Sequence, residues 1–251
     1  MNILIGPKLG DFFHCLLIPK LMWEYEKQKC NIFLCEKYDS FTNGLKKTYE
    51  ELKDIVLYQE YVKEFKIHEK EKIDMDLCNF RNSSKLCRDS WTNILIDMFL
   101  KNKKTIFDLK IIDWKKDYNY KDTFVFNRSS IRIIERGNKV IENFLKNKKC
   151  LFIYSFNEID NFLFKKNMIS LKCGSLNQML TIINSCKMFI GNLSAPLAIA
   201  HSLNKDRLCE IATNDGLQYT KEILNYNKIS WFSQNNAYIT ENHYDSLKNI
   251  L

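Results

Sequence analysis

The segment 186–210 most constrains the fold, because it reads as a strand, a glycine turn, a helix and a second strand. A short apolar run covers 187–190, the turn covers 191–194, and Pro196 takes a first helical position before a strand near 207–211. A helix that begins in this way exposes free backbone N–H groups and the positive end of its dipole. In an α/β sheet this helix start lies at the carboxyl end of a strand, where such folds bind anions, most often phosphate.

Expected strands and helices alternate along the rest of the chain. Short apolar runs favour strands, and apolar residues spaced three or four positions apart favour helices. Strands that alternate with helices of roughly 10–15 residues favour βαβ units and parallel sheets. The expected strands are 2–5, 31–35, 55–58, 65–68, 123–126, 150–154 and 168–170, and the expected helices are 12–27, 42–52, 86–100, 138–146, 159–164 and 175–185, followed by a βα-like stretch over 219–232.

A lysine-rich, weakly periodic segment over 101–121 divides this alternation into two halves. A chain of 251 residues has room for one large domain or two small ones. Because the pattern restarts after the segment, we expect one domain over 1–115 and a second over 116–251. The predicted fold class is α/β, with two Rossmann-like domains that face a cleft.

Composition and charge narrow the classes of partner. Hydrophobic residues make up 45% of the chain, enough for a substantial core, and the formal net charge is +8. A basic balance suits an anionic ligand or an acidic surface, although much of the lysine excess also fits a solvated surface. The basic residues are dispersed and form none of the usual nucleic-acid-binding motifs, so we expect no nucleic-acid partner. The charge permits peripheral contact with an anionic membrane surface, but no amphipathic helix is clear enough to predict it.

The nine cysteines form no CxxC pair and lack matching histidines, so we expect no metal site. Most of them stand in apolar runs, which is typical of reduced core residues in a reducing compartment. The N-terminal sequence has no basic region followed by a long apolar one, and no apolar run reaches about 18 residues. We therefore expect a cytoplasmic protein without a signal peptide or a membrane span.

Two short motifs resemble the ADP-heptose:lipopolysaccharide heptosyltransferase family. The first is Gly-Asp-Phe-Phe-His over 10–14, after the first strand, and the second is Phe-Ile-Gly-Asn-x-Ser-x-Pro over 189–196. The resemblance implies the two-domain GT-B glycosyltransferase fold, with an acceptor-side first domain and a second domain that binds a nucleotide sugar. It also implies inverting transfer of the sugar without a metal.

The second motif departs from the family's pattern, which reads Gly-Asn-Asp-Ser-Gly-Pro-x-His. Leu193, Ala195 and Ala198 replace its Asp, Gly and His, so the polar donor contacts of those positions are missing. His201 lies three residues beyond Ala198 and is not a substitute. The sequence therefore leaves open the sugar, the nucleotide base, the acceptor, the oligomeric state and the activity of the altered site.

Asp11 is the candidate catalytic base of the first domain. Inverting transfer needs a group that takes the proton of the acceptor hydroxyl, and the matching Asp has this role in the resembled family. A carboxylate on a glycine loop at Gly10, just after the first strand, fits the role. The alternative is an N-cap for a helix that begins at Phe12. His14 is either an acceptor-side residue or a structural histidine, and Lys8 is a weaker candidate for the phosphates.

An irregular polar segment over 73–85, together with the residues after it, is the other acceptor-side candidate. Such a segment would carry acceptor specificity, although most of its charges also fit a solvated surface. Arg88 is the residue that we assign to the acceptor, and Trp91 and Phe156 are rings that would suit stacking on a sugar or a base. The further candidates in this cluster are Asn79 and Arg81.

Arg128 is the candidate that stabilises the leaving nucleotide. It follows the strand expected at 123–126, and an arginine can bind a diphosphate through two parallel N–H bonds and offset its developing charge. The alternative is a surface arginine that pairs with a carboxylate. Asn127, Ser129 and Ser130 are expected to add donors beside it, and Arg132 is the substitute cation.

The helix start in the second motif is the other expected phosphate contact. Ser194 would bind phosphate together with the backbone N–H groups of Ala195 and Leu197, next to Pro196. As a plain N-cap, Ser194 would serve only the helix, and that role is compatible with phosphate binding.

Two further residues are expected near the donor. Asn192 either orients the turn or meets the ribose. Glu210, at the end of the strand after the helix, either holds ribose hydroxyls or forms an ion pair with Arg207.

The predicted function is inverting, metal-independent transfer of a sugar from a nucleotide-diphosphate donor to a hydroxyl of a glycan or a lipid-linked acceptor. The nucleotide sugar is a substrate, and no cofactor is expected. One alternative is a nucleotide-sugar-binding protein without catalysis, in which the altered motif marks a degenerate site. Another is a sugar-nucleotide epimerase of the same fold, which needs more titratable residues than we can locate. The lack of a GxGxxG sequence argues against a nicotinamide oxidoreductase.

Overall fold

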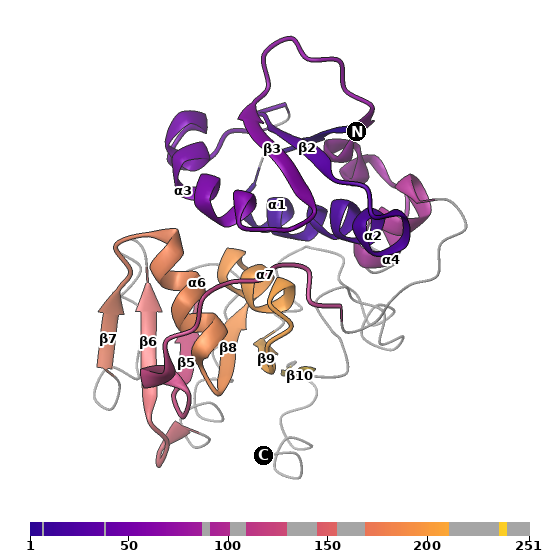
Figure 1. Ribbon diagram of the computed structural model, residues 1–251. Helices are drawn as coiled ribbons and strands as arrows, with labels where there is room; N and C mark the ends of the chain where they lie inside the picture. Colours follow the sequence, from indigo (N-terminus) through magenta and orange to yellow (C-terminus); the bar gives the residue numbers. More distant parts are fainter. Residues whose placement is uncertain are drawn as a thin grey trace. The chain divides into compact units, whose positions relative to one another are not determined.

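The computed structural model describes residues 1–6, 8–37, 39–86, 91–100, 109–129, 145–154, 169–210 and 236–239. The described residues form two compact units, Met1–Trp114 and the part from Lys115 onward. Each unit has its own parallel sheet (Figure 1). The predicted α/β class with parallel sheets is therefore confirmed. The domain bounds and the cleft stay predictions.

The first unit is built on a four-stranded parallel sheet with the order β3-β2-β1-β4. Its strands are β1 (Asn2–Ile5), β2 (Cys30–Leu34), β3 (Val62–Ile67) and β4 (Met75–Asp76). Strand β1 lies in the middle, because Ile3 pairs with Ile32 of β2 on one side and with Met75 of β4 on the other. The winding direction reverses between β1 and β4, which makes their carboxyl ends the expected ligand edge of this sheet.

Two helices, rather than the one predicted over 12–27, follow β1. They are α1 (Leu9–Cys15) and α2 (Leu17–Glu26). Pro19 explains the break, because a proline ring clashes with the carbonyl group four residues earlier, here that of Cys15, and has no N–H to donate. The first helix ends at Cys15, and Leu16 joins it to the second.

Helix α3 (Leu45–Leu57) spans residues for which the sequence predicts a helix over 42–52 and a strand over 55–58. The predicted strand is wrong. Leu52, Ile55 and Val56 are buried residues of α3, and their spacing of three and four places them on one helix face with Thr48. The apolar run continues the helix, which packs against β3.

The segment predicted as irregular contains β4 and a 3-10 helix, η1 (Leu77–Asn82). The Asp76 carboxylate caps η1 by accepting a hydrogen bond of 3.0 Å from the Cys78 N–H. Helix α4 (Trp91–Phe99) then packs against η1, α1 and α2. It confirms a helix within the predicted span 86–100 and buries Trp91, Ile94 and Leu95.

The second unit is built on a six-stranded parallel sheet with the order β10-β9-β8-β5-β6-β7. Numbered within the unit and read from β7, this is the order 3-2-1-4-5-6 of a doubly wound nucleotide-binding fold. The predicted strands 123–126, 150–154 and 168–170 are confirmed within two residues at each end. The observed strands are β5 (Phe124–Asn127), β6 (Cys150–Tyr154), β7 (Ile169–Lys172), β8 (Met188–Asn192), β9 (Arg207–Glu210) and β10 (Asn236–Ile239).

Two helices of the second unit pack against each other, and one of them also packs against β8 and β9. They are α6 (Leu176–Ser185) and α7 (Ala195–Ser202), and a 3-10 helix, η2 (Tyr118–Tyr120), precedes β5. Ser175 caps α6 by accepting a hydrogen bond of 3.2 Å from the Gln178 N–H. The elements predicted at 159–164 and 219–232 lie outside the described residues, as does 138–146 except for its last two residues.

Strands β5 and β8 approach each other closely at Gly191. A Cβ at this position would lie 2.7 Å from the carbonyl oxygen of Asn127 and 2.8 Å from a ring carbon of Phe189. Since Gly191 pairs in register with Asn127, a larger residue would push the two central strands apart.

Within the described ranges, the helices are too short or too polar to traverse a lipid bilayer.

Candidate functional site

The carboxyl ends of β5 and β8 lie side by side in the middle of the second sheet (Figure 1). The winding direction reverses between these strands, and α/β folds bind ligands just beyond such a point. Arg128 and Ser129 follow β5, while Leu193 and Ser194 follow β8. The fold thus brings together two groups of predicted site residues that lie far apart in the sequence.

Asn192 ties these two strand ends together. Its Oδ1 accepts hydrogen bonds from the Ser129 backbone N–H at 3.0 Å and from the Ser129 hydroxyl at 3.3 Å. Its Nδ2 donates to the Ser129 carbonyl oxygen at 3.2 Å. Asn192 is fully buried, so these bonds are shielded from water. In this geometry the Asn192 side chain orients the loop after β5.

Asn127 and Arg128 are both buried at the end of β5. The Asn127 Nδ2 donates a hydrogen bond of 2.9 Å to the Ile153 carbonyl oxygen in β6, so this amide holds the sheet together. Arg128 is 2% exposed, so it does not lie on the surface, and its predicted role toward the leaving nucleotide stays a prediction. A guanidinium at this depth acts in a medium of low dielectric, where its effect on a nearby anion is strong.

The start of α7 is half-exposed at Ser194, Ala195 and Pro196. Ser194 is the N-cap residue, but within the described part of the chain its side chain makes no capping bond. Its hydroxyl donates instead to the Asn192 carbonyl oxygen at 3.1 Å. The backbone N–H groups of the first helical turn therefore lack this side-chain cap, as suits an anion site.

Two of the three positions at which the chain departs from the family motif are buried, and the third, Ala195, is half-exposed. Leu193 is 5% exposed and Ala198 is fully buried. Their side chains therefore belong to the interior of the unit.

His201, in the last turn of α7, lies against a buried arginine. Its Nδ1 is 3.0 Å from Nη2 of Arg207, whose Nη1 donates a hydrogen bond of 2.6 Å to the Lys205 carbonyl oxygen. This contact explains His201 as a structural residue. The side chain of Glu210 is outside the described structure, so its predicted role stays a prediction.

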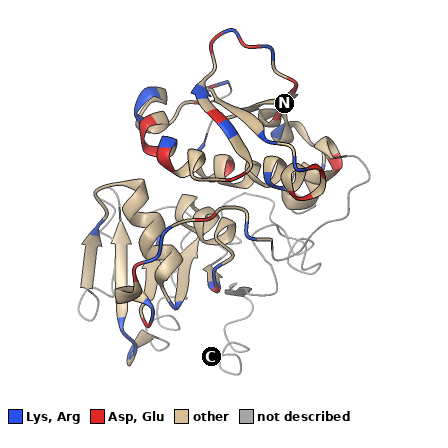
Figure 2. Ribbon diagram, viewed as in Figure 1, with Lys and Arg blue, Asp and Glu red and all other residues tan. Residues whose placement is uncertain are grey.

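Several described elements of the second unit carry no charged side chain. Strands β5, β6 and β8 and helices α6 and α7 contain no Lys, Arg, Asp or Glu, and Figure 2 shows these elements without charged residues. In the first unit, by contrast, residues of both signs are interspersed (Figure 2). The described strands and helices at the reversal point of the second sheet are therefore uncharged.

In the first unit, the structure corrects the local setting of Asp11. Gly10 and Asp11 lie in the first turn of α1 and not on a loop, and the N-cap position belongs to Lys8. The alternative that Asp11 caps the helix is therefore wrong. Asp11 is only 3% exposed and needs a polar partner.

Arg81, from η1, is that partner. Its Nε lies 2.5 Å from Oδ2 of Asp11 and its Nη2 lies 2.7 Å from Oδ1, a two-point contact between guanidinium and carboxylate. The Arg81 Cζ also lies 5.6 Å from the centre of the Trp91 ring and 5.7 Å from that of Phe80. Arg81 is a predicted acceptor-side candidate, but its pairing with Asp11 is not predictable from sequence, because 70 residues separate the two.

His14 and Trp91 belong to the interior of the first unit. His14 is 2% exposed, and its ring lies edge-on to Trp91 with 5.1 Å between centres. Trp91 also packs edge-on against Phe80 at 5.3 Å. This geometry favours the structural reading of His14, and it places Trp91 among core side chains, not on a surface that could stack on a sugar.

Lys8 forms an exposed ion pair with Asp39, with 2.7 Å between Nζ and Oδ2. The pair lowers the pKa of the Asp39 carboxyl, because the ammonium donates a hydrogen bond to it. Lys8 is engaged at this surface in the described structure, and its predicted contact with phosphates stays a prediction. The predicted site residues Ser130 and Arg88, like Arg132 and Phe156, lie outside the described residues.

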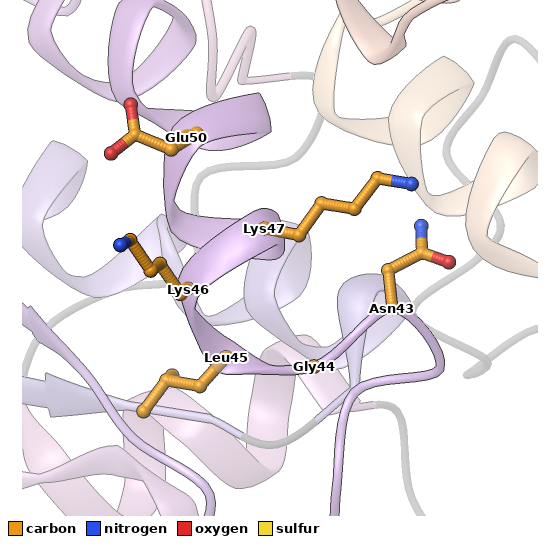
Figure 3. A pocket seen from close by; sticks show the side chains of 6 residues that line it. All are labelled: Asn43, Gly44, Leu45, Lys46, Lys47 and Glu50. Atoms are coloured by element: carbon orange, nitrogen blue, oxygen red, sulfur yellow. The ribbon is translucent and has the colours of Figure 1, made fainter.

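A pocket of about 540 Å³ opens at the start of α3, next to Gly44. Figure 3 shows Lys47 and Asn43 reaching to one side of the helix start, with Lys46 and Glu50 on the other side. This pocket is not among the predicted sites, and none of the predicted site residues lines it. The sequence feature that could have indicated this pocket is Gly44, which stands shortly before two lysines. In the structure Gly44 has a positive φ of 76°, a conformation that favours glycine.

Among the described residues, no three His, Cys, Asp or Glu side chains form a group that could hold a metal ion.

No family model and no curated protein matches the sequence significantly. Solved structures do match. A family 9 glycosyl transferase from Veillonella parvula has a TM-score of 0.66 at 11% identity, over 99% of this chain and 88% of that one. The chain has a glycosyltransferase-like fold.

Two further structures support this fold assignment. The E. coli heptosyltransferase WaaC with ADP-2-deoxy-2-fluoro heptose has a TM-score of 0.52 at 10% identity, over 100% of this chain and 98% of that one. The iron-containing dodecameric glycosyltransferase TibC from enterotoxigenic E. coli has a TM-score of 0.56 at 11% identity, over 88% of this chain and 62% of that one. The resemblance to heptosyltransferases is thus confirmed at the level of the fold.

Proposed function

We propose that this protein is an inverting, metal-independent glycosyltransferase. It moves a sugar from a nucleotide-diphosphate donor to a hydroxyl of a glycan or a lipid-linked acceptor. The observation that carries the proposal is the half-exposed start of α7 beside Arg128, at the reversal point of the second sheet. The fold supports the reaction class, because similar folds occur in a family 9 glycosyl transferase and in a heptosyltransferase holding an ADP-sugar analogue.

The second unit takes the donor in this proposal. The backbone N–H groups at the start of α7 and the Ser194 hydroxyl bind the diphosphate. Arg128 offsets the negative charge that grows on the nucleotide as the glycosidic bond breaks. Asn192 holds the Ser129 backbone in place, so the preceding residue, Arg128, is positioned before the substrate arrives.

Asp11 takes the proton of the acceptor hydroxyl. A carboxylate offers about four lone-pair sites, and the contact with Arg81 uses two of them, so it can still accept a hydrogen bond from an acceptor. Arg81 acts here as a positioning residue, since it fixes the orientation of the carboxylate. An inverting mechanism needs this orientation, because the hydroxyl must attack from the face opposite the leaving nucleotide.

The assignment of Arg128 supports metal independence, because a bound cation is otherwise the usual way to neutralise a leaving diphosphate. One structure of similar fold contains iron, so this part of the proposal needs a direct test.

The first experiment is a thermal-shift panel of ADP, GDP, UDP, CMP and their sugar conjugates, with EDTA and with Mg²⁺. A ligand that binds only the folded state raises the melting temperature by mass action. We expect one nucleoside diphosphate to give a shift that EDTA leaves unchanged and Arg128→Ala abolishes. Lys121→Ala, which removes an exposed cation of the same unit, is the matched control. No shift with any nucleotide would refute the donor site.

A second experiment tests catalysis with the nucleotide sugar that binds. Asp11→Asn keeps the size of the side chain but removes the base, so we expect transfer to stop while donor binding persists. Sustained turnover in this variant would exclude Asp11 as the base.

A binding protein without catalysis is the second candidate, because the buried Leu193 and Ala198 remove two polar positions of the family motif. It predicts a nucleotide-dependent thermal shift with neither hydrolysis nor transfer of the bound donor. Assays of sugar release on the wild-type protein separate the two candidates.

A further inference from the structure

Two cysteines meet at the carboxyl edge of the first sheet. Cys35 directly follows β2, and Cys78 lies in η1 just after β4, so the end of β1 stands between the strands that carry them. Their Sγ atoms are 3.7 Å apart. Gly6 makes room for this approach, because a Cβ on it would lie 2.2 Å from the Cys35 carbonyl oxygen and 3.1 Å from the Cys35 Sγ.

The two thiols differ in exposure and in acidity. Cys78 is 1% exposed, whereas Cys35 is half-buried and can be reached by a small molecule. The pKa of Cys35 is lowered to about 7, chiefly because the Cys78 thiol donates a hydrogen bond to its sulfur. The pKa of Cys78 is raised by the same hydrogen bond and by burial. The charged or titratable neighbours are Asp76, His68 and Lys37, of which Lys37 forms an ion pair with Asp76.

Five of the other six described cysteines differ from Cys35 in acidity. Burial raises the pKa of Cys15, Cys30, Cys150, Cys173 and Cys186 above the ordinary value. A thiolate is the form that reacts with disulfides, so these residues are poor nucleophiles at neutral pH.

We propose that Cys35 and Cys78 form a thiol–disulfide exchange site at which a low-molecular-weight disulfide closes an intramolecular disulfide bond. The Cys35 thiolate attacks one sulfur of the small disulfide, forms a mixed disulfide and releases one small thiolate. Cys78 then gives up its proton to a small thiolate and attacks the Cys35 sulfur, which expels the second small thiolate. Two protein thiols are oxidised, and one disulfide is reduced to two thiols.

The bond needs only a modest movement. A disulfide is about 2.05 Å long, so the sulfurs must approach by roughly 1.7 Å from their present 3.7 Å. Cys35 stands just beyond the end of β2, and its side chain already packs against Cys78.

The site has a consequence for Asp11 that rests on the proposed function. Cys78 and Arg81 are three residues apart in the same 3-10 helix, where residues at this spacing lie on the same side. A bond that draws Cys78 toward Cys35 shifts this helix, and with it the guanidinium that holds Asp11. Oxidation is therefore expected to lower transfer activity, whereas formation of the bond itself does not depend on that activity.

The test is oxidation of the full-length protein by excess glutathione disulfide at pH 8, followed by alkylation, tryptic digestion and mass spectrometry. We expect a disulfide that joins the tryptic fragments 30–37 and 73–81. The fragment with Cys35 also contains Cys30, so Cys30→Ser is the matched control and must leave the cross-link intact. The absence of this cross-link in the wild-type protein would overturn the proposal.

Two variants test the order of the steps. Cys78→Ser is expected to accumulate a stable glutathione adduct on Cys35, and Cys35→Ser is expected to leave Cys78 unmodified. Circular dichroism before oxidation verifies that each variant is folded. In the wild-type protein, Cys35 should react at pH 7 about tenfold faster than Cys173, because a far larger fraction of it is thiolate. Equal rates would contradict the proposal even if a variant failed to fold.

Discussion

The Arg81 guanidinium binds both carboxylate oxygens of Asp11, with Nε 2.5 Å from Oδ2 and Nη2 2.7 Å from Oδ1. Asp11 is buried at the start of a helix, whereas the Arg81 side chain remains 35% exposed. The pair therefore satisfies a buried charge from a position that a ligand can approach. This relationship links the candidate base to η1, a segment that follows the short edge strand β4.

Removing Arg81 should destabilise the folded protein, because the buried Asp11 carboxylate then lacks its partner. We expect Arg81→Met to lower the free energy of unfolding by about 2 kcal/mol, since it leaves Asp11 without its two charge-assisted bonds. Urea unfolding at pH 7 measures the change. The control is the same substitution in an Asp11→Asn background, where the loss should be smaller by roughly 1 kcal/mol. Equal losses in the two backgrounds would show that the pair contributes no coupling energy.

We expect Asn192 to contribute to both the stability of the fold and the binding of the nucleotide. Asn192→Ala leaves the Ser129 N–H and carbonyl groups without their side-chain partners in a poorly hydrated place. We expect a loss of about 2 kcal/mol in the free energy of unfolding and weaker nucleotide binding. Calorimetric unfolding and a nucleotide titration measure the two effects. Unchanged nucleotide affinity in a folded variant would argue against a positioning role.

Gly191 is predicted to tolerate no side chain. Gly191→Ala places a Cβ 2.7 Å from the Asn127 carbonyl oxygen, which lies in a central strand that cannot easily move. We expect a loss of about 2 kcal/mol in the free energy of unfolding. Gly174→Ala is the matched control, because the nearest atom to its Cβ would be Gln178 Oε1 at 3.7 Å. If the two variants lose the same free energy of unfolding, the close approach of β5 and β8 does not restrict the residue at position 191.

Ser194 should affect binding more than stability. Its hydroxyl donates to the Asn192 carbonyl oxygen and does not cap the helix. Ser194→Ala should therefore lower the free energy of unfolding by less than the ~1 kcal/mol that is usual for loss of an N-cap. We expect a melting temperature within about 2 °C of wild type, together with at least a threefold weaker nucleotide affinity. A stability loss without any change in affinity would assign Ser194 to the helix alone.

The Cys35 thiol should titrate near neutrality. Its pKa in the folded protein, about 7, lies below the ordinary value of 9.0, so the thiolate form stabilises the fold. This contribution is complete above about pH 9 and is lost as the pH falls through 7. The rate of alkylation of Cys35 by iodoacetamide should therefore have its midpoint near pH 7. Cys78→Ala removes the hydrogen-bond donor and should move the midpoint to higher pH. An unchanged midpoint would show that the Cys78 hydrogen bond does not lower the pKa of Cys35.

Much of the fold can be predicted from the sequence, because local residue patterns determine the strands and the helix starts. The apolar run at 150–154 becomes β6, and Ser175 caps α6 as its side chain allows. The exceptions arise where one pattern fits two structures. The run at 55–58 suits a strand by composition, yet Leu52 and Thr48 extend the same buried face backward at helical spacing, and the helix prevails.

The candidate site is readable only in part. The residues at the ends of β5 and β8 can be named from sequence, because a glycine turn and a helix start follow a strand. Their contacts cannot be named, since Asn192 reaches Ser129 across 63 residues and Arg81 reaches Asp11 across 70. Nothing local in the sequence distinguishes an arginine that binds a ligand from one that holds a carboxylate.

By itself, the sequence determined the parallel α/β class, the helix start at Ser194 and the hydrophobic positions Leu193 and Ala198. These features depend on neighbouring residues and on local backbone preferences. The tertiary structure decided the strand order, the close passage at Gly191 and the meeting of Cys35 with Cys78. Such features depend on which strands lie side by side, and that choice is made by the packing of the whole unit.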